Sequence, residues 1–220
     1  MRPGVPTLEI VILAYQNMTA LDAMGPYEFL SRLPEARLRF VADEKGSITT
    51  DTGMLTFLAE ESIENVESAD VLVIPGGPDD AVQAVLDNPK TIDWVARIHT
   101  NTRYTISVCT GSLILGKAGL LEGKRAGCHW MALEGLREYG AIPCSDRIVV
   151  DGKLWTAGGV TSGIDMALAF AAEIAGEDFA QILQLATQYD PKPPFKGGTP
   201  ENAPDHIVEF LRGNASAVLG

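Results

Sequence analysis

Cysteine is scarce in this sequence, and its few residues follow no ligand or disulfide pattern. The three cysteines stand at 109, 128 and 144, with neither a CxxC pair nor a Cys/His spacing typical of a metal site. An odd number of cysteines argues against a disulfide framework, which favours a reducing compartment. We therefore expect no bound metal and a cytoplasmic location.

Basic side chains and long apolar runs are scarce as well. The chain has 17 Lys and Arg residues against 29 Asp and Glu residues, a net charge of -12. This charge repels a phosphate backbone, so we expect no nucleic-acid partner. The first apolar run, LEIVIL, is too short for a secretory core and contains Glu9, and no run approaches the roughly 20 residues of a membrane span. We expect neither export nor membrane insertion.

The residues that are present suit one domain over 1–220. Apolar residues make up 46% of the 220 positions, enough for a sizeable core. Short β-branched runs alternate with helical patterns, and these runs are continuously apolar. Strands of that kind are covered on both faces, so the sequence predicts an α/β fold with a mainly parallel sheet. The predicted strands are 8–15, 37–43, 69–77 and 104–109, and the predicted helices are 20–33, 162–176 and 205–213.

Two segments, 47–62 and 147–159, are typical of small antiparallel hairpins. In the second, Asp151-Gly152 is a two-residue turn signal. The helix after Ser162 is predicted to pack on the sheet, with Ser162 and Asp165 forming a capping box. The Pro- and Gly-rich stretch 189–204 is predicted to lack regular structure. The apolar face predicted for the helix consists of Ile164, Ala167, Leu168, Ala171, Ile174 and Ala175.

The stretch TISVCTGSLILGKAGLL, residues 105–121, places Cys109 where a strand turns into a helix. Open α/β sheets hold their ligands at this carboxyl edge, and Gly111 permits close backbone approach. Unpaired N–H groups at the start of the helix favour a thiolate over a thiol. The pattern indicates a reactive cysteine, although a buried structural cysteine explains the local sequence equally well.

Two more segments end at the same predicted edge of the sheet. Gly76-Gly77 closes the strand in ADVLVIPGG, and its N–H groups are candidate donors to an anion that forms near Cys109. Taken alone, Pro-Gly-Gly is a turn. Asp22 follows the first strand in NMTALDAMGP, where a surface or helix-capping role is the simpler interpretation.

The segments ALDAMGPYEFL, DVLVIPGGPDD, SVCTGSLILGKAGLLEGKRAGCHW, LWTAGGVTSGIDMALAFAAEIAG and YDPKPPFKGGTP agree in order and spacing with one known family. Together they resemble the DJ-1/PfpI superfamily, and within it the isocyanide hydratases, over roughly residues 8–203. The resemblance implies a flavodoxin-like α/β sandwich with helices on both faces, a homodimer and a nucleophilic Cys109. It also implies that Asp22 is the acidic partner, and Asp rather than Glu favours the hydratase branch.

Other branches of the superfamily fit less well. Relatives with claimed peptidase activity carry His directly after the nucleophile, where this chain has Thr110. Glutaminase relatives use a downstream His-x-Glu, which none of His99, His129 and His206 begins. The chain after the last strong helix is too short for the helix-turn-helix module of the regulator relatives.

One segment departs from the hydratase pattern. Close relatives read Ala-Thr-Thr-His-Trp where this chain has Ala-Gly-Cys-His-Trp at 126–130, so we expect a pocket of different shape and polarity. Beside Gly127, Cys128 is either a second thiol near the site or, as we favour, a small buried filler. His129 is interpreted as a structural histidine hydrogen-bonded at a strand end, and Cys144 as a loop residue without a role.

The resemblance implies the cofactor-free hydration of an isocyanide to an N-substituted formamide. A Cys109 thiolate attacks the terminal carbon, and Asp22 supplies the proton from a carboxyl whose pKa is raised by burial and by the thiolate. Thr110 offers its N–H or hydroxyl to the intermediate, with Gly77 and Gly111 as further contacts. We also expect a strained backbone at Cys109 and the Asp22 carboxyl within hydrogen-bond reach of its sulfur.

Two rival functions are left open by the sequence. One is a cofactor-free glyoxalase that acts on small 2-oxoaldehydes. The other is a redox-responsive stress protein whose Cys109 oxidises to sulfinate.

Overall fold

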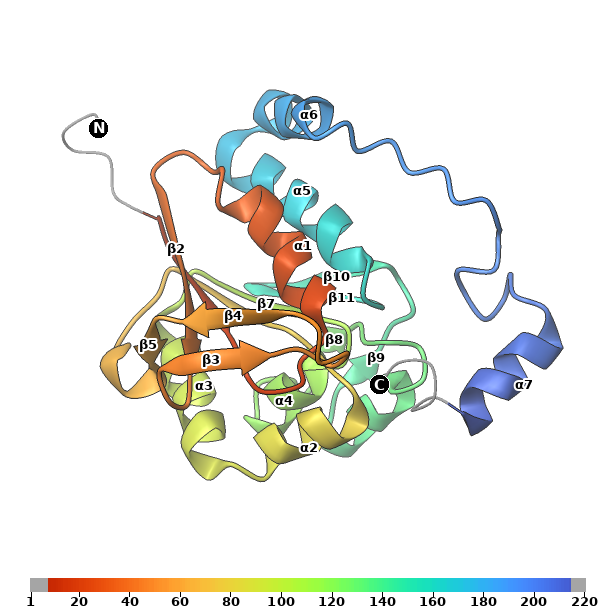
Figure 1. Cartoon of the computed structure of the whole chain (residues 1–220), viewed down its shortest axis with the longest axis horizontal. Helices are drawn as coiled ribbons and strands as arrows, with labels where there is room; N and C mark the ends of the chain where they lie inside the picture. Colours follow the sequence, from red (N-terminus) through yellow and green to blue (C-terminus); the bar gives the residue numbers. More distant parts are fainter. Residues whose placement is uncertain (1–7, 215–220) are drawn as a thin grey trace.

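A computed structural model of the chain describes residues 8–214, in which a seven-stranded sheet lies between two layers of helices (Figure 1). The strand order is β10-β11-β7-β6-β1-β2-β5, and within this sheet only β10 runs antiparallel to its neighbour. Segments 1–7 and 215–220 of the predicted domain lie outside the described residues. The strands are β1 Leu8–Leu13, β2 Ala36–Ala42, β5 Glu61–Ser62, β6 Val71–Ile74, β7 Tyr104–Val108, β10 Ile148–Asp151 and β11 Leu154–Ala157.

Helices cover both faces of the sheet. In Figure 1, α1, α5 and α6 lie above it and α2, α3 and α4 lie below it. The helices are α1 Ala20–Leu30, α2 Asp79–Leu86, α3 Pro89–Asn101, α4 Gly111–Lys117, α5 Ser162–Ala175, α6 Glu177–Ala186 and α7 Asp205–Gly213, with short 3₁₀ helices at Ile63–Asn65 and Leu133–Tyr139.

The central strand β1 shows why the apolar runs are continuous. Ile10 and Ile12 join one buried cluster with residues of α1 and α5, whereas Val11 and Leu13 join the cluster formed with α2, α3 and α4. Successive side chains point to opposite faces of a strand. Because both faces of β1 are buried, apolar residues are required on both. The predicted α/β sandwich with a mainly parallel sheet is therefore confirmed.

The two predicted hairpins exist, with one correction. β3 (Gly46–Thr49) pairs with β4 (Thr56–Ala59) as a separate antiparallel ribbon, while β10 and β11 form the edge of the main sheet. Asp151 faces Leu154, so the two-residue loop is Gly152-Lys153 rather than the predicted Asp151-Gly152. Gly152 has φ 62°, which glycine adopts without a steric penalty.

The start and the buried face of α5 differ from the prediction. Its N-cap is Thr161, and no side chain caps the helix, so the predicted capping box is wrong. Asp165 instead pairs with Arg147 and accepts a hydrogen bond from the Tyr189 hydroxyl at 2.7 Å. The buried face is Ser162, Gly163, Met166, Ala167, Phe170 and Ala171, offset from the predicted one. The remaining predicted apolar positions are half-buried, because α1 packs beside α5.

Several elements were not predicted from the sequence. They include α2, α3, α6, the short strand β5 and the two-residue strands β8 (Arg125–Ala126) and β9 (Ile142–Pro143). In α3, Asn88 accepts a hydrogen bond from the Thr91 N–H and Pro89 occupies the first turn, which is a common helix start.

The C-terminal segment stands apart from the sheet. After α6 the chain runs without regular structure to α7, as predicted for 189–204, and Figure 1 shows this connection looping away from the body. No residue of α7 is buried. Within residues 8–214, no helix has the length and apolar character that crossing a membrane requires.

Candidate active site

Cys109 occupies the turn between β7 and α4. Its φ is 58°, a left-handed conformation that is rare for a residue with a side chain. The Cys109 N–H donates to the carbonyls of Ala157, at 3.2 Å, and Gly158, at 2.8 Å, which fixes the turn against the end of β11. The predicted strained elbow is confirmed.

Gly111 allows α4 to start directly against the end of β6. A Cβ at this position would clash with the carbonyl oxygen of Ile74 and would lie 2.8 Å from that of Pro75. Only glycine fits there without movement of the backbone. The predicted close approach therefore serves to pack α4 on the sheet, and contact of Gly111 with a substrate stays a prediction.

Asp22 lies in the first turn of α1 and is fully buried. Its Oδ2 accepts a hydrogen bond from the Gly76 N–H at 2.9 Å, so the ends of β1 and β6 meet at this carboxyl. Its Oδ1 is buried and has no hydrogen-bond partner among residues 8–214. An unsatisfied buried carboxyl oxygen is costly, and it is available to a proton or a substrate.

The pKa of Asp22 is raised from 3.8 to about 7, chiefly by burial. Hydrogen bonds from the Gly76 N–H and the Cys109 thiol lower this pKa, and the charge of Asp51 raises it. The prediction that burial raises the pKa is confirmed. The prediction that a Cys109 thiolate also raises it stays a prediction, because Cys109 acts here as a thiol, and a thiol that donates to the carboxylate stabilises the charged form.

Cys109 itself is buried, and burial raises the pKa of its thiol well above the ordinary value, followed by the charges of Asp22 and Cys128. The N–H and the hydroxyl of Thr110 lower the pKa, but by less. The thiolate predicted from the helix N-terminus is therefore wrong for the protein on its own. Burial removes water from around the sulfur, and this destabilises the thiolate more than the Thr110 donors stabilise it.

Thr110 connects the elbow to the glycine pair. Its hydroxyl accepts a hydrogen bond from the Gly77 N–H at 2.9 Å and donates to the Gly77 carbonyl at 2.8 Å. Because that proton is engaged, the Thr110 N–H is the principal donor left for the sulfur. With Gly76 bonded to Asp22, both glycine N–H groups have partners, so Gly77 can stabilise an oxyanion only if Thr110 releases it.

Two residues of the site, Tyr15 and Asp51, were not predicted from the sequence. The Tyr15 hydroxyl donates to the Pro75 carbonyl at 3.0 Å, and the pKa of Tyr15 is raised by burial and then by the charges of Asp22 and Cys109. Asp51, in the loop of the β3–β4 hairpin, acts on the pKa of Asp22. Tyr15 lies two residues after the end of β1, at the carboxyl edge of the sheet, which is a usable signal. Nothing in the local sequence indicates Asp51.

The other two cysteines and His129 play different parts. Cys128 is buried, as predicted, and burial raises the pKa of its thiol to about 12; it is also close enough to raise the pKa of Cys109. Burial lowers the pKa of His129, but its ring makes no hydrogen bond within residues 8–214, unlike the prediction. Cys144 lies in a loop, and all three cysteines are free. In the described part of the chain, no group of three or more His, Cys, Asp and Glu side chains is placed to hold a metal ion.

Comparison with known proteins identifies the family of this chain. Residues 9–173 match the DJ-1/PfpI family, and the chain belongs to that family. The isonitrile hydratase of Pseudomonas putida is 41% identical over 212 residues, which are 96% of this chain and 92% of that protein.

Two further relatives are a protein of solved structure and a longer protein. A ThiJ/PfpI family protein from Pseudomonas syringae has a solved structure that is 34% identical, with a TM-score of 0.93 over 98% of this chain and 88% of that one. The HTH-type transcriptional regulator CdhR of Pseudomonas aeruginosa is 25% identical over 82% of this chain, which spans only 53% of the regulator. This chain is thus similar to proteins that are named for different functions, so its function has to be argued from the site.

Proposed function

We propose that this protein hydrates isocyanides to N-substituted formamides, with Cys109 as nucleophile and Asp22 as proton carrier. The 41% identity to an isonitrile hydratase supports the reaction. The observation that supports the mechanism is the buried Asp22 carboxyl, whose pKa of about 7 suits a group that must both accept and return a proton near neutral pH.

The first half of the reaction adds the S–H group across the terminal carbon. As the Cys109 sulfur attacks that carbon, its proton passes to the unpartnered Oδ1 of Asp22. Asp22 then returns the proton to the same carbon, which gives a thioimidate, R–N=CH–S–Cys. A thiol with a raised pKa is compatible with this step, because a thiolate forms only as the proton leaves for Asp22.

The second half releases the product. Water adds to the thioimidate carbon. As it does so, Asp22 takes a proton from the water and transfers a proton to the nitrogen. The C–S bond then breaks, the new hydroxyl becomes the formamide carbonyl, and its proton returns to sulfur through Asp22. The sum is R–N≡C plus H₂O giving R–NH–CHO, without a metal or an organic cofactor.

Thr110 supports both halves by a different route. Its N–H lowers the pKa of the Cys109 thiol, so it stabilises the sulfur when negative charge develops there. Its hydroxyl, at the start of α4, is hydrogen-bonded to Gly77, and this bond helps to fix the position of Cys109 relative to Asp22. Gly77 and Gly111 are proposed as backbone contacts of the intermediate.

The test is a turnover assay of the purified protein with p-nitrophenyl isocyanide and, in parallel, methylglyoxal. We expect formamide from the first and no turnover of the second, and we expect Cys109→Ala to abolish formamide production while the fold persists. Turnover of methylglyoxal alone would support the glyoxalase alternative. Turnover of neither substrate, with peroxide-dependent partner binding, would support the redox-responsive alternative.

A further inference from the structure

The β3–β4 hairpin holds a buried hydroxyl group that has no part in the mechanism proposed above. Thr50 directly follows β3, and its N–H donates to the Leu55 carbonyl at 2.9 Å, which continues the pairing of the two strands. The residue is fully buried, and within residues 8–214 its Oγ1 has no hydrogen-bond partner. A buried hydroxyl without a partner is costly, so its presence needs an explanation.

Hydrogen bonds on both sides of Thr50 attach the hairpin to the loop between β1 and α1. The Asn17 N–H donates to the Thr49 carbonyl at 2.8 Å, and the Asp51 N–H donates to the Met18 carbonyl at 3.1 Å. Figure 1 shows the loop end of this ribbon beside the start of α1. Thr50 is therefore held against residues 17 and 18.

The same loop borders the candidate active site. A Cβ on Gly77 would lie 3.2 Å from the Met18 Cα. The next residue, Thr19, donates its N–H to the Gly76 carbonyl at 3.0 Å, and the Gly76 N–H donates to the Asp22 carboxyl at 2.9 Å. The loop thus contacts the hairpin on one side and the glycine pair of the site on the other.

The side chain of Thr50 lies on the face of the hairpin that packs against this loop. Side chains alternate along a strand, so Thr50 shares its face with Ile48, which is buried in the same cluster as Met18. The charge of Asp51 raises the pKa of Asp22, so the loop end of the hairpin lies within electrostatic reach of the site. The Thr50 hydroxyl therefore points toward the site rather than toward solvent.

We propose that the Thr50 hydroxyl and the unpartnered Oδ1 of Asp22 together bind the water molecule that hydrolyses the thioimidate. The inference rests on the proposed function and assigns a further residue to its second half. Oδ1 of Asp22 accepts the proton that the water gives up, and the Thr50 oxygen accepts a hydrogen bond from the other proton. Both lone pairs of the water oxygen are then free, and one of them faces the thioimidate carbon.

A hydroxyl with this role affects only one half of the reaction. The attack of the Cys109 sulfur on the isocyanide and the return of the proton to carbon involve no water, so they do not depend on Thr50. Thr50 itself gains and loses no proton, because it only orients the water. Loss of its hydroxyl should therefore allow the thioimidate to form and slow its hydrolysis.

The experiment removes the hydroxyl and keeps the branched shape of the side chain, with the variant Thr50→Val. With p-nitrophenyl isocyanide we expect kcat to fall about tenfold or more, since one lost hydrogen bond to a reacting group has an effect of that size. Single-turnover consumption of the isocyanide should stay within about threefold of the wild type. Mass spectrometry after an acid quench should find more thioimidate on Cys109 than in the wild type.

Thr52→Val is the matched control, because Thr52 is exposed in the loop of the same hairpin, and this variant should behave as the wild type. Thr50→Ser keeps the hydroxyl and should retain kcat within about threefold of the wild type. A hydroxyl without a protein partner does not stabilise the fold, so the urea midpoint of Thr50→Val should equal or exceed that of the wild type. A lower midpoint would show that the hydroxyl has a structural role, which contradicts the inference.

The outcomes separate this inference from the proposed function. If the wild type does not hydrate the isocyanide, the proposed function fails, and this inference fails with it. If the wild type is active and Thr50→Val leaves kcat unchanged, or slows both halves of the reaction equally, the hydroxyl does not hold this water and only the inference is overturned. Slower hydrolysis of the thioimidate alone, absent from Thr50→Ser and Thr52→Val, supports it.

Discussion

The site at the ends of β1, β6 and β7 and the C-terminal segment after α5 are packed in opposite ways. At the site, buried groups from three separate segments contact one another, and Gly76 and Gly111 leave no space for a Cβ. In the C-terminal segment, residues 176–213, several large apolar side chains face outward. Ile182, Leu185 and Phe195 are 62%, 81% and 82% exposed.

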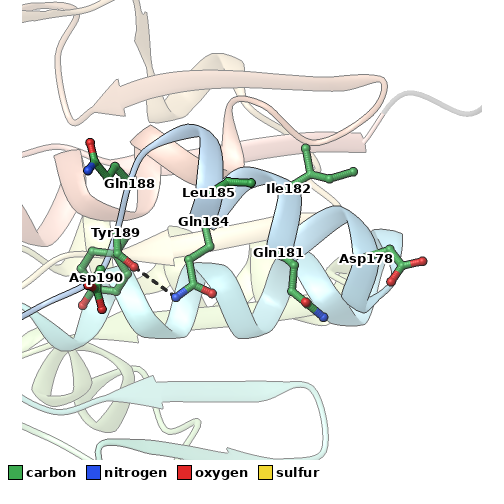
Figure 2. Close-up of a pocket in the computed structure, with 8 residues that line it drawn as sticks. All are labelled: Asp178, Gln181, Ile182, Gln184, Leu185, Gln188, Tyr189 and Asp190. Atoms are coloured by element: carbon green, nitrogen blue, oxygen red, sulfur yellow. Dashed lines mark hydrogen bonds between the residues drawn. The ribbon is translucent and has the colours of Figure 1, made fainter.

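A surface pocket on α6 illustrates the second region. Figure 2 shows its lining residues spread along the helix and the turn after it, with Ile182 and Leu185 projecting from one side. The one hydrogen bond drawn there runs from the Gln184 amide to the Tyr189 carbonyl, at 3.1 Å. Within residues 8–214, contacts from several segments thus constrain the site residues, whereas few contacts constrain these apolar side chains. Substitutions should therefore have large effects at the site and small ones in the segment.

Among substitutions that keep the Cys109 thiol, Asp22→Asn is expected to have the largest effect on catalysis. Asparagine keeps the size of the side chain and can still accept from the Gly76 N–H, but it cannot carry a proton between sulfur and carbon. We expect kcat/KM for an isocyanide to fall by a factor of about 100 or more, while the thiol still alkylates with iodoacetamide. Near-normal turnover would reduce Asp22 to a positioning residue.

The same substitution should also change the pH dependence of stability. The pKa of Asp22 is about 7 in the folded protein against 3.8 ordinarily, so the folded state binds this proton more tightly than the unfolded state. The resulting stability is fully present below about pH 4 and is lost as the pH rises toward 7. Above that range the wild type carries a buried carboxylate, at a cost of up to about 4 kcal/mol.

Urea unfolding at pH 5 to 8 checks this prediction. Asp22→Asn cannot ionise, so its free energy of unfolding should rise relative to the wild type as the pH increases through this range. Asp178→Asn, at an exposed position on α6, is the control and should track the wild type at every pH. A constant difference between Asp22→Asn and the wild type would show that Asp22 does not titrate in this range.

Gly111→Ala tests the close packing at the site. The added methyl group would meet the carbonyl oxygens of Ile74 and Pro75, and we expect a loss of about 1 to 3 kcal/mol in the free energy of unfolding. At Gly198, in the C-terminal connection, an added Cβ would have no neighbour within 4 Å, so Gly198→Ala should cost far less. Equal losses in urea unfolding would contradict the contrast between the two regions.

The sequence could predict features that adjacent residues determine, and it could not predict features that depend on contacts between distant segments. The position of Cys109 followed from adjacent residues, a strand before it and Gly111 after it. The role proposed for Asp22 required the family resemblance, since its contacts with Gly76 and Cys109 come from distant segments. Tyr15 escaped notice because its hydroxyl partner, Pro75, is 60 positions away.

Two errors have the same origin. The capping box on α5 failed because Asp165 is engaged by Arg147 and Tyr189, which arrive from other parts of the chain. The thiolate prediction failed because the N-terminus of a helix is visible in the sequence, whereas the depth at which the sulfur is buried is set by the whole fold.

The smallest effect is expected for Phe195→Ser. This side chain is 82% exposed and buries little in a single copy of the chain, so the free energy of unfolding should change by no more than about 0.5 kcal/mol. The homodimer expected from the family resemblance makes the measurement informative, because a second copy that covered Phe195 would make the loss larger and dependent on protein concentration. Urea midpoints of both proteins at two concentrations, with light scattering to establish the oligomeric state, distinguish these cases. A large, concentration-dependent loss would show that Phe195 is exposed in the single chain but covered in the assembled protein.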